Sequence, residues 1–155
     1  LYLTIYLFMN MGTFACILAM RRQGRMVEDI DALAGLSKTN PYMALAIAVF
    51  MFSMAGVPPL AGFFAKFYVF LAAIEAGLYV LTVVGLLTSV VGAYYYLRIV
   101  KIMYFDEPAE AFDRPVGREI SVIVAVTGVV TVFFFIGLAP VLNGAEAAAA
   151  VLFGT

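Results

Sequence analysis

Lys66 is the residue whose type and position in this sequence point most directly to chemistry. It lies inside a long apolar stretch, residues 41–75, seven residues after Pro59 and nine before Glu75. In a helix that rises 1.5 Å per residue, nine residues place Lys66 about 13 Å from that end, close to the middle of a membrane. A lysine there costs on the order of 3 kcal/mol, and burial disfavours the charged form of its amine. An amine that can lose its charge can take up and release protons, so the position predicts a proton relay.

The residues just before Lys66 are expected to break the helix that carries it. Pro58 and Pro59 each lack a backbone N–H, and the residue before a proline is pushed out of helical geometry. Gly56 and Gly62 flank the prolines and permit unusual dihedral angles or close packing. A broken helix in lipid leaves carbonyl groups unpaired, which is tolerated only where protein or a water-filled cavity satisfies them. The pattern therefore predicts an internal cavity beside Lys66, as at the ion sites of transporters.

A purely structural role for the same residues stays open. Lys66 could form a static ion pair with a carboxylate of another helix, although this sequence offers no carboxylate at matching depth. The proline pair could be an ordinary kink of the kind that membrane helices tolerate.

Other polar residues are weaker candidates for the same path. Asn10, Thr13 and Glu75 are interpreted as candidates for a polar path, although hydrogen bonding between helices explains the first two equally well and Glu75 is expected to be solvated at a helix end. The remaining hydroxyl groups of the apolar stretches are expected to bond back to their own helices; they belong to Ser53, Thr82, Thr88 and Ser89.

Four apolar stretches must position these residues. The chain has 155 residues, of which 65% are hydrophobic and 12% charged, far from the balance of soluble domains. About 20 apolar residues are needed to cross a bilayer. The sequence predicts an all-α, polytopic helical bundle that forms a single membrane domain over residues 1–155, with about four spans, the second broken at Pro58–Pro59: residues 1–20, 41–75, 78–104 and 119–139, followed by a surface tail, 140–155.

The basic residues are distributed unevenly over the predicted loops. Of nine lysines and arginines, eight lie in or beside the first and third loops, and the ninth is Lys66. The positive-inside rule places these loops in the cytoplasm and the C-terminus outside. The acidic residues of the third loop are expected to form a plain exposed segment: Asp106, Glu107, Glu110 and Asp113.

Composition argues against several classes of function. The net charge of −1 gives nucleic-acid binding no electrostatic basis. Without histidine, and with Cys16 as its one cysteine, the sequence predicts no metal site. No cofactor-binding motif is apparent either, so none is expected in this chain.

The sequence resembles a known family of membrane proteins. The stretch MFSMAGVPPLAGFFAKFYVF is similar to the broken late helix of the antiporter-like subunits of respiratory NADH:quinone oxidoreductase, complex I. The stretches VVGAYYYLRIVKIMYFDEP, YLFMNMGTFACILAM and IDALAGLSKTNP resemble the subunit N group of that family in particular. The likeness covers nearly all of the chain.

The resemblance implies a proton-pumping role. Members of this family have two inverted halves, each with a broken helix, and the lysine of the second broken helix, here Lys66, works in a proton half-channel toward the outer side. The resemblance also implies that the chain is the C-terminal part of a larger subunit in a bacterial inner membrane. Its expected partners are the lipid bilayer, protons and the other membrane subunits, and NADH, FMN, iron–sulfur clusters and quinone are expected to act at partner subunits. The enzyme would be a proton-pumping translocase with no redox chemistry in this chain.

The sequence is also consistent with two other functions. The chain could belong to a multisubunit cation/proton antiporter, which would share the broken helix and the lysine. It could also be a membrane scaffold in which Lys66 forms a static ion pair.

Overall fold

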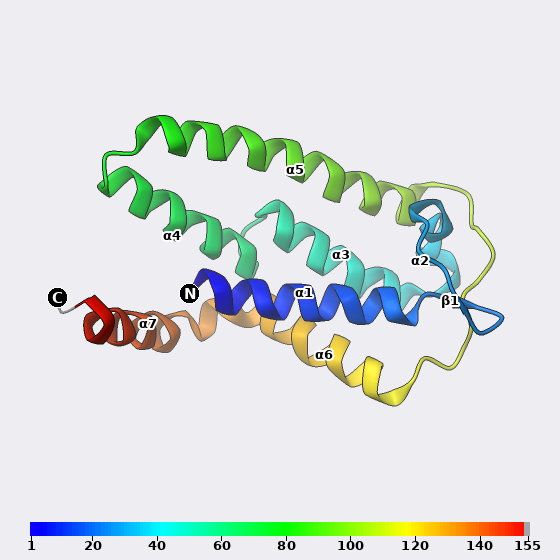
Figure 1. Cartoon of the computed structure of the whole chain (residues 1–155). Coiled ribbons are helices and arrows are strands. Elements are labelled where there is room, and N and C mark those ends of the chain that lie inside the picture. Colours follow the sequence, from blue (N-terminus) through cyan, green and yellow to red (C-terminus); the bar gives the residue numbers. More distant parts are fainter. Residues whose placement is uncertain (154–155) are drawn as a thin grey trace.

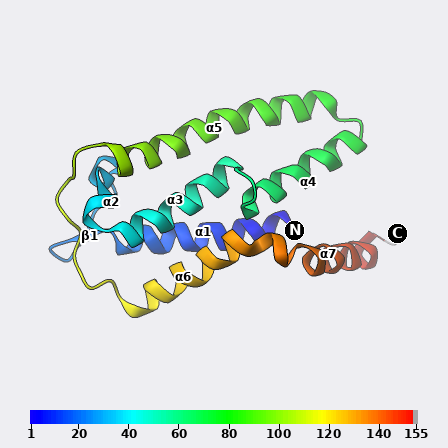
Figure 2. The same cartoon turned by 180° about the vertical axis from the view of Figure 1, so that it is seen from behind.

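The protein is a bundle of helices that run side by side (Figures 1 and 2). A computed structural model describes residues 1–153. In it α5 extends along the whole bundle, and α3 and α4 follow one another end to end beside it (Figure 1). The long elements are α1 (Tyr2–Ala19), α3 (Pro41–Ala55), α4 (Ala61–Glu75), α5 (Tyr79–Phe105), α6 (Arg118–Phe133) and α7 (Leu138–Phe153).

Within the described residues, three helical segments are long and apolar enough to cross a membrane, namely Tyr2–Ala19, Tyr79–Phe105 and Arg118–Ile136. The remaining crossing, the second along the chain, is divided between α3 and α4. Each has 15 residues and is therefore only about 22 Å long, short of the 30 Å of a hydrocarbon core. Together they have the length of a span, with the interruption at Gly56–Leu60. The predicted helical membrane bundle, broken at Pro58–Pro59, is confirmed.

The end of the chain differs from the prediction. The fourth span was expected to end at residue 139, before Pro140, and to be followed by a surface tail. Instead α6 ends at Phe133, a 3₁₀ turn η2 (Phe134–Ile136) follows, and α7 begins at Leu138. Pro140 is the third residue of α7, where a missing N–H costs nothing because first-turn amides have no partner inside the helix. The alanine-rich sequence that follows has high helix propensity, so the tail is helical as far as Phe153.

Small residues allow the helices to pack closely. Gly12 of α1 is buried, and a Cβ atom built there would lie 2.6 Å from the hydroxyl oxygen of Thr127 on α6 and would overlap the Phe50 ring on α3. Close approach of backbones at small residues is the usual basis of helix association in membranes. The surrounding core is apolar, with Phe50 and Met103 fully buried at its centre.

The two loop segments 20–40 and 106–117 gather at one end of the bundle, and the short α4–α5 turn lies at the other (Figure 1). The first loop is not plain coil. It contains a two-stranded antiparallel hairpin, a 3₁₀ turn and a short helix: β1 (Arg21–Arg22), β2 (Arg25–Met26), η1 (Ile30–Leu33) and α2 (Leu36–Thr39). Gln23 and Gly24 both have positive φ, as tight hairpin turns require. Eight of the nine basic residues therefore lie at one end of the molecule.

The third loop docks on this hairpin through Asp113, which is exposed as expected but forms contacts that a plain exposed segment would not have. Its carboxylate accepts hydrogen bonds from the backbone N–H groups of Gln23 (2.9 Å) and Gly24 (2.8 Å). Next to it, the buried Phe112 ring lies 5.0 Å from the guanidinium carbon of Arg22. Without Asp113, the two backbone N–H groups of the turn would have no protein acceptor. A carboxylate is a strong acceptor, which explains why an acidic residue is useful there.

We expect Asp113→Ala to release the third loop from the hairpin, because both turn amides lose their acceptor. Amide hydrogen exchange at Gln23 and Gly24, measured on the full-length subunit in membranes, should become faster. Glu110→Ala is the matched control, since Glu110 lies in the same loop with an exposed side chain. Equal exchange in the two variants would contradict the docking role.

The same contact should depend on pH. The hydrogen bonds from Gly24 and Gln23 lower the pKa of Asp113 below its ordinary value, because they favour the carboxylate. A lowered folded-state pKa means that the docking is fully present above the ordinary pKa of about 4 and is lost as the pH falls through the folded-state value. We therefore expect acidification to speed exchange at these amides in the parent protein and to have little effect in Asp113→Ala.

Candidate functional site at the helix break

The break between α3 and α4 has a clear local cause. Gly56 ends α3 with φ 90°, and its N–H bonds to the carbonyls of Phe52 and Ser53. This left-handed cap is the typical way for glycine to end a helix. The residues four positions after Met54 and Ala55 are Pro58 and Pro59, which have no N–H to donate. The proline pair therefore leaves the last two carbonyls of α3 without their helical donors.

Lys66 uses one of these freed carbonyls. Its Nζ donates a hydrogen bond to the Ala55 carbonyl oxygen at 3.2 Å, reaching back from the second turn of α4 to the end of α3. The carboxyl end of a helix carries a partial negative charge, which stabilises a cation. The half-helix α3 thus provides the counter-charge for the lysine, and the side chain is half-buried.

Gly56 leaves room for this side chain. A Cβ atom at Gly56 would lie 3.2 Å from Cδ and 3.5 Å from Nζ of Lys66. Both its positive φ and this closeness explain why the sequence has glycine at the break.

Ser53 ties the two half-helices together. Its hydroxyl is fully buried, accepts a hydrogen bond from the Gly62 N–H at 2.9 Å and donates to the Met9 sulfur at 2.9 Å. Gly62 is the second residue of α4, so its amide is one of those that a helix start leaves unpaired, and the Leu60 cap provides no side-chain acceptor. A Cβ atom at Gly62 would overlap the Ser53 carbonyl, so only glycine fits this contact.

The expectation that Ser53 bonds to its own helix is therefore wrong. Thr82 and Thr88 do bond to carbonyls of their own helix, at 3.0 and 2.9 Å. Ser53 differs because a second helix begins beside it with an amide in need of an acceptor. The signal available in the sequence was the proline pair itself, since a break creates a new helix start.

Two cavities meet at Lys66. The larger, about 530 Å³, lies between α1, α4 and α5, and the smaller, about 370 Å³, lies between the break, α4 and α5. Lys66, Phe70 and Ser89 line both. The smaller cavity is walled mainly by aromatic and aliphatic side chains. The larger one also has polar groups, from Asn10, Ser53, Thr88, Ser89, Tyr2, Tyr6 and Tyr96. Among the described residues, no carboxylate lines either cavity.

Asn10 lines the same cavity as Lys66, and the other two candidates do not. Asn10 lines the larger cavity and donates to the Tyr6 carbonyl at 2.7 Å. Thr13 donates to the Met9 carbonyl at 2.8 Å and lines a different cavity, near Glu28. Glu75 is the exposed last residue of α4, at the far end of the helix from the break. Thr88 and Ser89, which were not among the candidates, line the cavity that Lys66 lines, and Thr13 does not.

Comparison with known proteins assigns the chain to a family. The family model described as NADH:quinone oxidoreductase/Mrp antiporter, transmembrane, matches residues 1–92. NADH-quinone oxidoreductase subunit N of Paramagnetospirillum magneticum is 65% identical over 99% of the chain, and that of Rhodospirillum rubrum is 61% identical over 97%. The chain spans 31% of the length of each of these relatives.

A solved structure has the same fold. A chain of the respiratory complex I from Thermus thermophilus, solved with bound Aureothin, is 35% identical and superposes with a TM-score of 0.74, over 91% of this chain and 32% of that one. The resemblance inferred from the broken helix and its neighbours is thereby confirmed. The chain belongs to the NADH:quinone oxidoreductase/Mrp antiporter transmembrane family, and within it the chain is similar to subunit N of NADH-quinone oxidoreductase.

Proposed function

We propose that the chain is part of a proton-translocating membrane subunit of NADH:quinone oxidoreductase, in which Lys66 relays protons toward the outer side of the membrane. One observation carries the proposal. The Nζ of Lys66 lies on a carbonyl that the proline pair has freed, at the edge of a cavity with polar side chains. Intramembrane lysines are rare and expensive, and half-helix ends that hold ions are typical of transporters.

The local geometry supports two states of the lysine. Charged Lys66 is held by the Ala55 carbonyl and by the partial negative charge of the end of α3. When the charge of neighbouring groups changes, the ammonium loses its proton to the larger cavity and the contact with Ala55 weakens. A hydroxyl can both donate and accept hydrogen bonds, so with water the Ser89 hydroxyl provides the next position for the proton, and the Thr88 hydroxyl, which donates to the Gly85 carbonyl, can accept there.

In this proposal the redox chemistry belongs to other subunits. NADH, FMN, iron–sulfur clusters and quinone act at those partners, and the electron transfer they support changes the charge around Lys66. Nothing in the proton step needs a bound cofactor, because an amine, hydroxyls and water are sufficient to move a proton.

Filling the larger cavity tests the proposal. We expect Ser89→Leu, in the full-length subunit of the whole complex, to lower NADH-driven proton pumping several-fold, because an apolar side chain would replace a hydroxyl that lines both cavities. Pumping is measured in inverted membrane vesicles with a pH-gradient dye. The matched control is Val91→Leu, on the same helix with an exposed side chain. Equal pumping by the two variants would remove the cavity from the path.

The second candidate function is cation/proton antiport, which the description of the family includes. It predicts pH-gradient formation that depends on sodium and continues without NADH-oxidising partners. The proposed function predicts a pH gradient that does not depend on sodium and that forms only with the NADH-oxidising partners. The names of the relatives favour this proposed function over antiport.

We further propose that the loop end of the bundle faces the cytoplasm, because it holds eight basic residues. In single-cysteine variants of the full-length subunit with Cys16 replaced, Ser37→Cys and Ala111→Cys should stay unlabelled when an impermeant thiol reagent is added outside cells. Ala76→Cys, in the turn at the opposite end, is the control that should be labelled. External labelling at position 37 or 111 would reverse the orientation.

A further inference from the structure

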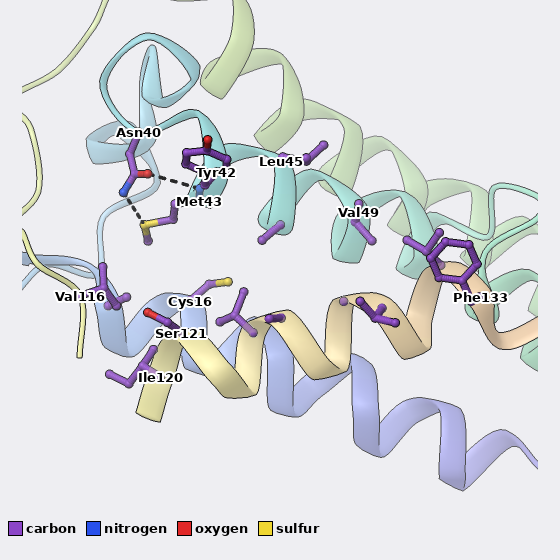
Figure 3. A pocket seen from close by; sticks show the side chains of 17 residues that line it. Cys16, Asn40, Tyr42, Met43, Leu45, Val49, Val116, Ile120, Ser121 and Phe133 are labelled. Carbon is purple, nitrogen blue, oxygen red and sulfur yellow. Dashed lines mark hydrogen bonds between the residues drawn. The ribbon is translucent and has the colours of Figure 1, made fainter. Parts of the chain in front are cut away.

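A second feature of the bundle lies away from Lys66, in a groove between α3 and α6. Its walls come from these two helices (Figure 3), and Cys16 and Ala19 of α1 also line it. The groove has a volume of about 400 Å³ and is lined mostly by aliphatic side chains. Its polar side chains lie at the start of α3 and the start of α6, and they belong to Asn40, Tyr42 and Ser121. The α3–α6 groove is therefore apolar inside the membrane and polar where the loops begin.

The groove is long enough to hold the acyl chain of one leaflet of a bilayer. Along α6 its lining runs from Ile120 to Phe133, about 20 Å of helix. One leaflet contributes half of a hydrocarbon core of about 30 Å. The groove starts at the loop end and runs parallel to the helices, which is the direction of a lipid chain (Figure 3). Such a shape suits an extended acyl chain better than a compact molecule.

Two basic residues lie next to lining residues at the loop end of the groove. The Arg114 guanidinium donates to the Thr39 carbonyl, which fixes it beside Asn40. Arg118 is the first residue of α6, three positions before Ser121, and Glu119 is the one acidic residue of that first turn. The Gly117 cap gives α6 no side-chain acceptor, and the amides at such a helix start favour an anion nearby.

We propose that the α3–α6 groove binds an anionic phospholipid of the loop-side leaflet. One acyl chain lies in the groove, and the phosphate lies at Arg114 and Arg118. Basic pockets between membrane helices are typical binding sites for anionic headgroups. The proposal does not depend on the proton path, because none of its residues lines a cavity at Lys66.

The test uses the whole complex in nanodiscs that contain a phosphatidylglycerol with a diazirine on one acyl chain. After illumination, we expect labelled peptides from α3 and α6. Replacing both arginines, Arg114→Gln with Arg118→Gln, should lower this labelling about thirtyfold, because each basic residue near the membrane surface contributes roughly 1 kcal/mol to anionic lipid binding. Glutamine can still donate to the Thr39 carbonyl, so the loop should keep its fold. Arg25→Gln, an exposed charge of the hairpin at the same end, is the control and should leave labelling unchanged.

A second variant tests the groove itself. A Cβ atom at Gly128 would come no closer than 4.0 Å to Phe50, so Gly128→Leu can be accommodated and should exclude the acyl chain. Labelling by the matched phosphatidylcholine probe should be weak throughout. Equal labelling by the two probes, or labelling that is indifferent to the arginines, would overturn the anionic site. Absence of labelled α3 and α6 peptides, with crosslinks to another protein segment in their place, would show that protein fills the groove.

Discussion

Lys66→Arg is expected to leave the full complex assembled and to lower proton pumping at least about tenfold, as loss of a proton-transfer group typically does. Arginine keeps the positive charge and can still donate to the Ala55 carbonyl, which the lysine contacts at 3.2 Å. A scaffold that needs only a cation at this position should therefore tolerate it. Arginine does not lose its proton in proteins, so a relay that must visit the neutral state should not.

The measurement compares three variants in the same membranes. Assembly is checked first on native gels, and NADH-driven pumping is then followed with a pH-gradient dye. Lys66→Ala removes both the charge and the amine that carries the proton, so it should lose pumping whether Lys66 is a relay or a static cation. Lys101→Arg, at an exposed position near the end of α5, should pump normally. If Lys66→Arg assembles and pumps at close to the wild-type rate, the relay is wrong and the static ion-pair role is correct.

The break was predictable because proline acts locally. A residue without an N–H must leave the carbonyl four positions earlier unpaired, wherever the chain is placed. The predicted depth of Lys66 likewise rests only on its distance along one helix to Glu75. These conclusions needed no knowledge of which helices become neighbours.

The missed features all depend on contacts between segments that are distant in sequence. Asp113 lies 89 residues from Gly24, whose amide it accepts from, and nothing in either local sequence predicts their meeting. Ser53 was assigned to its own helix because the other partner, the Gly62 amide, becomes available only when α4 starts beside it. Pro140 was interpreted as a helix end, although proline is equally compatible with a first turn, and the alanines that follow decide the outcome.

Removing the prolines should have the second largest effect. Pro58→Ala with Pro59→Ala restores two N–H groups, which can pair with the carbonyls of Met54 and Ala55. The Ala55 carbonyl then has a backbone donor that competes with Lys66, and the backbone that opens to the cavity closes. Alanine is a good helix former, so assembly should survive. We expect NADH-driven pumping to fall several-fold and the amides at positions 58 and 59 to be protected from hydrogen exchange.

The single variants separate the two carbonyls. Pro59→Ala restores the donor for Ala55, the oxygen that Lys66 contacts, whereas Pro58→Ala restores the donor for Met54 only. Pro59→Ala should therefore reduce pumping more than Pro58→Ala. Pro41→Ala is the control, because Pro41 begins α3 and breaks nothing. If the double variant shows protected amides and yet pumps like the parent complex, the break has no role in proton transfer. If the double variant loses pumping while the two single variants pump at equal rates, the prolines act in some way other than by keeping the Ala55 carbonyl free for Lys66.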